Sequence, residues 1–106
     1  MIMNATDWNT ALFEKMSDEQ DKFRDWLKSQ PPEEILHHTY EYTVREDIMM
    51  TMEELELTDT QAQALLESPS PLADVYRYFE KLETGYMDVI RDSIENRADD
   101  VCRAQE

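Results

Sequence analysis

The chain has 106 residues, of which 25 are acidic and 10 basic, so its formal net charge is −15 at pH 7. This length is enough for one domain with a single modest core, and the negative surface argues against direct binding to nucleic-acid phosphates or anionic membranes. One glycine and four prolines are too little turn material for an all-β fold. We therefore expect residues 1–106 to form a single all-α domain.

A first amphipathic helix is predicted over residues 7–29. Its apolar residues recur at helical spacing: Trp8, Leu12, Met16, Phe23, Trp26 and Leu27. The polar gap in this stripe holds Ser17 three residues before Gln20, which is the spacing of a capping box. A break into two helices at Ser17 is therefore the alternative, but we favour one continuous helix.

The second helix is predicted over residues 32–55. Proline cannot continue the helix before it but suits a first turn, where Glu33 and Glu34 face the positive end of the helix dipole. The apolar stripe consists of Leu36, Tyr40, Val44, Ile48, Met52 and Leu55. Ile35, Tyr42 and Met49 extend this face beyond what one core needs, which leaves room for a homodimer through that flank.

A short third helix is predicted over residues 59–67. Thr58 and Gln61 have capping-box spacing directly before it, and Ala62, Leu65 and Leu66 then share one face. The sequence "SPSP" closes this helix.

A long fourth helix is predicted over residues 71–103, with Ser70 as its N-cap and Pro71 at its first position. Its stripe consists of Leu72, Val75, Phe79, Leu82, Tyr86, Ile90, Ile94 and Val101. Gly85 interrupts the helix at a cost of about 1 kcal/mol relative to alanine, which packing can offset. Three long helices and one short helix joined by brief turns predict a compact antiparallel bundle.

The adjacent histidines are the first candidates for chemistry. Glu33, Glu34 and Glu41 lie three or four residues from His37 and therefore share its helical face. Neighbouring residues on a helix diverge by about 100°, so His37 and His38 are poorly placed to share a metal ion. A di-iron bundle needs two Glu-x-x-His motifs on separate helices, and this sequence has only these two histidines. We expect a surface or boundary histidine pair and no metal.

The remaining catalytic patterns are weak or absent from the sequence. It has no Ser/His/Asp constellation, no glycine-rich phosphate loop and no Cys-x-x-Cys motif. The single cysteine, Cys102, cannot form an internal disulfide, and Asp99 and Asp100 nearby disfavour its thiolate. We therefore expect neither enzymatic activity nor a cofactor. A metal-assisted enzyme centred on His37 and Glu41 is the weakest alternative.

The acidity is concentrated on the second and third predicted helices. Residues 31–68 contain ten acids and one base, Arg45. An exposed tyrosine or methionine beside such acids favours contact with a protein, whereas Met49 and Met52 are expected to fill the core. The candidate interaction surface consists of Glu41, Tyr42, Glu46, Asp47, Met50, Glu53 and Glu54.

Three segments, "QPPEEILHHTYEYTVREDIMM", "LTDTQAQALLESPSPLADVYRYFEKLE" and "YMDVIRDSIENRA", resemble a small uncharacterised domain family of gut-dwelling Gram-positive bacteria. The resemblance covers roughly residues 12–98. It implies a context, since members are met in gene sets of conjugative and other mobile elements, and it carries over no catalytic or ligand-binding residue.

The leading functional hypothesis is a non-enzymatic helical module that binds a protein partner through its acidic second and third helices. An alternative is a DNA-mimic inhibitor whose carboxylates occupy the nucleic-acid-binding groove of a host protein. No basic region followed by a long apolar run opens the sequence, and no window approaches 18 apolar residues. A cytoplasmic location is therefore expected.

Overall fold

The structure is a computed structural model that describes residues 5–82 and 85–105. It contains five helices: α1 (Ala5–Lys28), α2 (Pro32–Glu54), α3 (Asp59–Leu66), α4 (Pro71–Leu82) and α5 (Tyr86–Ala104). Within the described ranges there is no β-strand. The expectation of an all-α protein is therefore confirmed.

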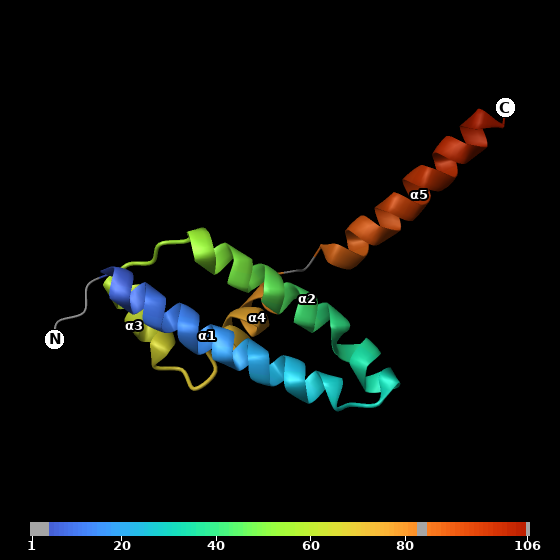
Figure 1. Cartoon of the computed structure of the whole chain (residues 1–106). Helices are drawn as coiled ribbons and strands as arrows, with labels where there is room; N and C mark the ends of the chain where they lie inside the picture. Colours follow the sequence, from blue (N-terminus) through green and yellow to red (C-terminus); the bar gives the residue numbers. More distant parts are fainter. Residues whose placement is uncertain (1–4, 83–84, 106) are drawn as a thin grey trace.

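Helix α1 is continuous through the polar gap at Ser17, as favoured from the sequence. It lies beside α2, and the short turn that follows Lys28 makes the two helices antiparallel (Figure 1). Leu12, Met16 and Leu27 of the predicted stripe are buried. Gln20 in the polar gap is buried as well, whereas Trp26 of the stripe is 44% exposed. This long buried face makes α1 the helix against which the others pack.

Helix α2 presents a different face to α1 than its apolar stripe predicts. His38, Tyr42 and Arg45 contact the aromatic rings near the end of α1, and Met49 joins the core. By contrast, 72% of Leu36 and 42% of Tyr40 are exposed, although the stripe places both inward. The prediction for these two turns is wrong because the aromatic rings near the end of α1 pack against the face of α2 that carries His38, Tyr42 and Arg45.

The core lies where α1, α2, α3 and α4 meet. It consists of Leu12, Met16, Met49, Ala62 and Leu72, with half-buried apolar residues packed around them. The predicted capping box of α3 is confirmed. Thr58 Oγ1 accepts from the Gln61 backbone N–H at 3.2 Å, and Gln61 Oε1 accepts from the Thr58 N–H at 3.1 Å.

Two charged residues of α1, one turn apart, bind the helix ends on either side of the turn between α3 and α4. Lys15 Nζ donates to the carbonyl oxygens of Leu66 and Ser68 at 2.8 and 2.6 Å. The Glu19 carboxylate accepts from the backbone N–H groups of Leu72 and Ala73, both at 2.8 Å. A cation therefore faces the negative end of α3 and an anion the positive end of α4, which is the favourable arrangement for both helix dipoles.

The predicted helix over residues 71–103 is two helices, and this prediction is therefore corrected. α4 ends at Leu82, and α5 begins after Gly85. A Cβ atom at Gly85 would meet no other atom within 4 Å, so no packing at that point offsets the cost of glycine in a helix. Residues 83 and 84 lie outside the described ranges.

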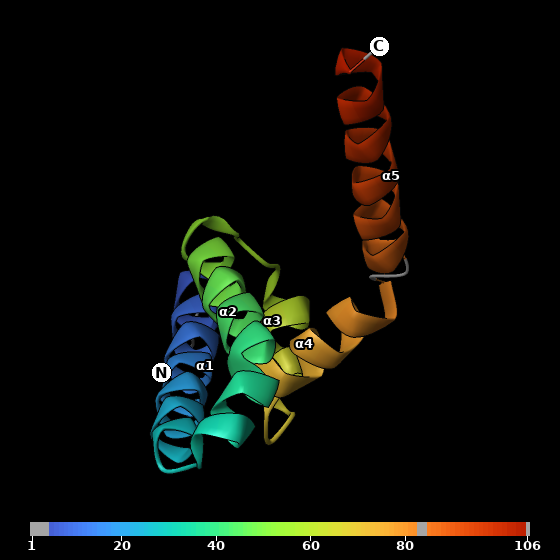
Figure 2. The same ribbon diagram turned by 90° about the vertical axis from the view of Figure 1, so that its right-hand side faces the viewer.

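Helix α5 projects from the body formed by α1–α4, in both views of the chain (Figures 1 and 2). The radius of gyration is 19.1 Å and the extents are 73 × 35 × 20 Å. A compact domain of this length has a radius of gyration of about 13 Å. The predicted compact bundle of three long helices and one short helix is therefore not confirmed, because α5 buries no residue against the body.

Asp74 stabilises the first turn of α4 and supplies a pH-dependent prediction. The hydrogen bond from Ser68, and next the Arg77 guanidinium, lower the pKa of Asp74 below its ordinary value. The stabilisation is therefore present above about pH 3.9 and is lost as pH falls through the lowered folded-state pKa. We expect Asp74→Asn to lower Tm by about 1–3 °C at pH 7. The difference in Tm between the two proteins should shrink as pH falls below about 3.9, and a difference that stays constant as pH falls would contradict the assignment. Asp18→Asn is the control.

Candidate interaction surface

Three of the seven candidate residues on α2 lie toward α1. Glu41 is half-buried and binds Arg45, and Tyr42 stacks on Phe23 with ring centroids 6.5 Å apart. Glu46 Oε1 accepts from Gln20 Nε2 at 2.9 Å. These side chains join α1 to α2 and are only partly available to a partner.

Arg45 is the centre of this contact between α1 and α2. Its Nε and Nη2 donate to Glu41 Oε2 at 2.9 and 2.6 Å, and Nη1 lies 3.8 Å from Glu19 Oε2. The guanidinium also lies 4.1 Å from the centre of the Phe23 ring, within the range of a cation–π interaction. With 7% of the residue exposed, Arg45 is a buried cation with two carboxylates and a ring around it. The only base of the acidic segment is thus part of the fold.

The other four candidates, Asp47, Met50, Glu53 and Glu54, are exposed. Met50 is 63% exposed, in contrast to the buried Met49 one position before it. The expected division of the methionines between core and surface is therefore observed. These four residues belong to the last two turns of α2, so the accessible part of the predicted surface is the C-terminal end of that helix.

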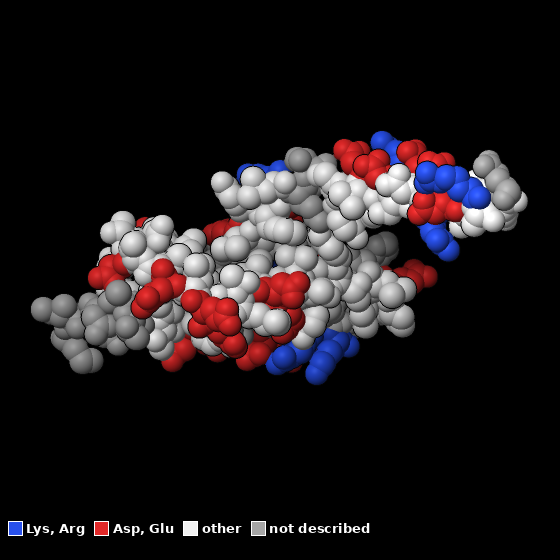
Figure 3. All heavy atoms as spheres, turned by 90° about the horizontal axis from the view of Figure 1, so that it is seen from above, with Lys and Arg blue, Asp and Glu red and all other residues white. Residues whose placement is uncertain are grey.

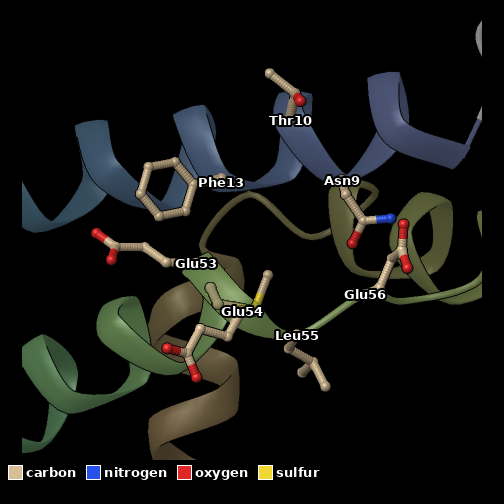
Figure 4. Close-up of a pocket in the computed structure, with 8 residues that line it drawn as sticks. Asn9, Thr10, Phe13, Glu53, Glu54, Leu55 and Glu56 are labelled. Atoms are coloured by element: carbon tan, nitrogen blue, oxygen red, sulfur yellow. The ribbon is translucent and has the colours of Figure 1, made fainter.

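A hollow of about 470 Å³ lies between the end of α2 and α1. Its lining consists of Asn9, Thr10, Phe13, Met52, Glu53, Glu54, Leu55 and Glu56. Figure 4 shows the carboxylates of Glu53 and Glu56 at separate places along the hollow, with Phe13 of α1 facing its interior. Leu55 adds an apolar side chain that is 47% exposed. The hollow therefore combines an apolar floor with an acidic rim.

The electrostatics of this helix end are unfavourable for the isolated protein. The last turn of α2 contains Glu53 and Glu54 and no base. The C-terminus of a helix carries about half a negative charge, so acids there are repelled and cations attracted. Figure 3 shows carboxylates gathered on the helical body with few cations among them, whereas acids and arginines alternate at the projecting C-terminal end. The last turn of α2 thus supplies no cation of its own to this field.

The segment after α2 is held in place by an α1 residue that sequence reasoning missed. Asn9 Nδ2 donates to the Leu57 carbonyl at 2.8 Å, and Asn9 Oδ1 accepts from the Leu57 N–H at 3.0 Å. This pair of bonds fixes the chain that carries Leu55 and Glu56. The sequence holds a weak signal, because asparagine is a poor helix former and stands inside the first turns of a strongly patterned helix.

The histidines occupy different environments. His37 is exposed, whereas His38 is half-buried, with its ring 5.1 Å from that of Trp26 in an edge-on arrangement. His38 also lies 3.7 Å from a Glu41 oxygen and 3.9 Å from a Glu34 oxygen. Over residues 5–82 and 85–105, no three His, Cys, Asp or Glu residues are grouped so that they could hold a metal ion. The environment of His38 is that of an aromatic contact between α1 and α2.

A comparison with protein families places the chain. The model of a family described as "Protein of unknown function (DUF3848)" matches residues 8–102. The chain belongs to this family. The match extends over all five helices of this DUF3848 chain and includes residues 86–102 of α5. No curated protein and no solved structure matches it. Among the described residues, no helix has the length and apolarity required to cross a membrane.

Proposed function

We propose that this DUF3848 protein is a non-enzymatic interaction module that binds a basic segment of a protein partner at the C-terminal end of α2. The observation that carries the proposal is the position of Glu53 and Glu54. Both are exposed at a helix end that repels them, and both line a hollow with an apolar floor. Acids that served solubility alone would be less costly to folding at other surface positions.

The chemistry of the hollow defines the partner. A lysine or arginine would meet the carboxylates of the rim and the negative end of the α2 dipole at once. An apolar side chain next to that cation would cover Phe13 and Leu55. We therefore propose a partner segment in which a cation adjoins an apolar residue. The resemblance to a family found with mobile elements supports a cytoplasmic role in the biology of such an element.

The binding experiment compares two variants with equal charge changes. Glu53→Gln, Glu54→Gln and Glu56→Gln together neutralise the rim of the hollow. The matched control neutralises the exposed acids Asp18, Asp25 and Glu80, which lie outside the hollow. We expect the rim variant to lose binding to a partner captured from the native host, while the control retains it. Equal loss in both variants would show a nonspecific charge effect and overturn the proposal.

The same capture experiment distinguishes the DNA-mimic alternative. Binding should weaken between 0.1 M and 0.5 M salt in either case, because screening acts on exposed charges. Competition by duplex DNA would identify the bound surface as the partner's nucleic-acid-binding groove. Binding that is unaffected by DNA would assign a different basic surface to the partner.

A stability measurement without any partner tests whether Glu53 and Glu54 are repelled at the C-terminal end of α2. Replacing Glu53 and Glu54 with glutamine removes their repulsion by the α2 carbonyl groups, so we expect Tm to rise by about 2–4 °C. Thermal unfolding followed by circular dichroism checks this. Glu33→Gln with Glu34→Gln, at the opposite end of α2, should lower Tm instead, because these acids face the positive end of the dipole. A decrease in Tm for the Glu53/Glu54 variant would show that these acids are not repelled at the end of α2.

A further inference from the structure

Helix α5 carries a largely exposed stripe of four apolar residues and one arginine. Within it Ile90 is half-buried, and beside it Tyr86 contacts Tyr40 of α2 with ring centroids 5.9 Å apart. Met87, Ile90, Ile94, Arg97 and Val101 recur at alternating three- and four-residue spacing, which keeps them on one face. Of these side chains, Met87 is 67% and Ile94 is 65% exposed, and no residue of α5 is buried. Most of the stability of a helix in a protein comes from packing of its apolar face, so packing of this stripe would stabilise α5.

The body of the protein has an uncovered apolar groove on the α4 side of α2. The groove has a volume of about 370 Å³. Its apolar lining includes Val44, Ile48 and Met52 of α2, Leu65 of α3, and Val75 and Phe79 of α4. Asp47 also lines it and is exposed. This groove shares Met52 and Leu55 with the acidic hollow but lies toward α4, whereas the hollow lies toward α1.

The stripe is somewhat longer than the groove and is complementary to it in charge. The groove follows α2 from Val44 to Leu55, which is about 17 Å of helix. The stripe runs from Met87 to Val101, which is about 21 Å. Within the described chain, Arg91 and Arg103 pair with acids of α5, but Arg97 has no ion pair. The stripe therefore presents one cation, and the groove presents one carboxylate, that of Asp47.

Arg97 also argues against pairing between two α5 helices. In a parallel pair, each Arg97 would face its own copy in the apolar seam, and an antiparallel pair centred on Ile94 would keep the two arginines about 9 Å apart along the seam. Like charges in a desolvated seam are costly, whereas a carboxylate beside the guanidinium is favourable. The groove with Asp47 is thus the better complement of the stripe.

We propose that α5 of one molecule lies in the α2–α4 groove of a second copy, which places its own α5 in the first molecule's groove. The helix already extends from the body that carries its own groove (Figures 1 and 2). Reciprocal exchange closes with twofold symmetry and buries two stripes rather than one. This doubling matters because stable interfaces bury about 1,200–2,000 Å² in total. The proposal does not depend on the function of the acidic hollow.

Spin labelling of Cys102 shows whether α5 lies in the groove of a second copy or in the groove of its own molecule. Cys102 is the only cysteine and is exposed on α5. Protein of natural isotope abundance that carries a nitroxide on Cys102 is refolded together with ¹⁵N-labelled Cys102→Ser protein, so that only contacts between chains broaden resonances. We expect broadening at residues 44–55 and 75–79. Broadening confined to α5, or none at all, would overturn the proposal.

Variants of the stripe and of Asp47 in the groove test the same contact through the molecular mass of the protein. Wild-type protein should have the mass of two chains by light scattering, and Ile94→Glu should weaken dimerisation at least tenfold. Asn96→Glu, on the opposite face of α5, is the matched control and should remain dimeric. Asp47→Arg and Arg97→Asp should each weaken the dimer, and combining them should restore it. A monomeric wild type, or a double variant weaker than both single variants, would contradict the exchange.

Discussion

Replacing Arg45 with alanine is expected to lower the free energy of unfolding by about 2–3 kcal/mol. The guanidinium is buried between Glu41, Glu19 and the ring of Phe23. Its removal leaves two carboxylates near one another without a cation, and loss of one partner of a buried ion pair costs about 3–5 kcal/mol. We expect a smaller loss here than that range because 22% of the Glu41 side chain and 17% of the Glu19 side chain remain exposed to water.

Urea unfolding at pH 7 measures this change, and Arg45→Lys separates charge from geometry. Lysine keeps the positive charge but cannot donate two bonds from a planar group or stack on Phe23 in the same way. We therefore expect an intermediate loss for Arg45→Lys. Arg91→Ala, in an ion pair that is 67% exposed, is the control and should leave Tm within about 1 °C. An Arg45→Ala protein as stable as wild type would show that the cluster contributes little to folding.

Replacing Glu19 with alanine is expected to cost about 2 kcal/mol. Its carboxylate accepts from the backbone N–H groups of Leu72 and Ala73, and hydrogen bonds to charged groups contribute about 1.5–3 kcal/mol each. The expected cost is lower than the sum because alanine admits water to the end of α4. Glu19→Gln keeps an acceptor and should lose less. The exposed Glu14→Ala on the same helix is the control and should leave the midpoint of unfolding unchanged.

A double-mutant cycle tests whether Glu19 and Arg45 act together. The two side chains lie 3.8 Å apart, so the losses in Glu19→Ala and Arg45→Ala should not add. We expect the double variant to be more stable than the sum of the single losses predicts, because removing Glu19 also removes one of the carboxylates that Arg45 neutralises. Strict additivity would show that Glu19 acts on α4 alone.

The helix boundaries could be predicted from the sequence because their signals are local. The Thr58–Gln61 capping box, the prolines before α2 and Pro71 at the start of α4 each act within one turn, and the observed ends follow them closely. The break between α4 and α5 was not predicted. The apolar stripe continues through Gly85, and only the tertiary structure shows that no packing offsets the glycine there.

The inward face of α2 could not be predicted from periodicity. Leu36 and Tyr40 are apolar and lie at stripe positions, yet they are exposed, whereas the charged Arg45 is buried. The choice depends on Phe23 and Glu19 of α1, residues about 20 or more positions away that receive the guanidinium. A hydrophobic pattern does not contain that information.

Part of the interaction surface could be predicted from periodicity, and part could not. Periodicity indicated correctly that Met50 faces outward, and Glu53 and Glu54 are likewise exposed. It could not show that Glu41 and Glu46 bind Arg45 and Gln20, because those contacts need partners that the helix pattern does not specify. The apolar floor of the hollow, which includes Phe13 of α1, is a tertiary feature for the same reason.

Amide chemical-shift mapping of the ¹⁵N-labelled protein during titration with its captured partner tests the proposed binding surface most directly. We expect the shifted resonances to cluster at Asn9, Phe13 and residues 53–56, which line the hollow, and to stay unshifted in the Glu53→Gln, Glu54→Gln, Glu56→Gln variant. Shifts confined to other surfaces, or the same shifts in that variant, would contradict the proposed binding surface.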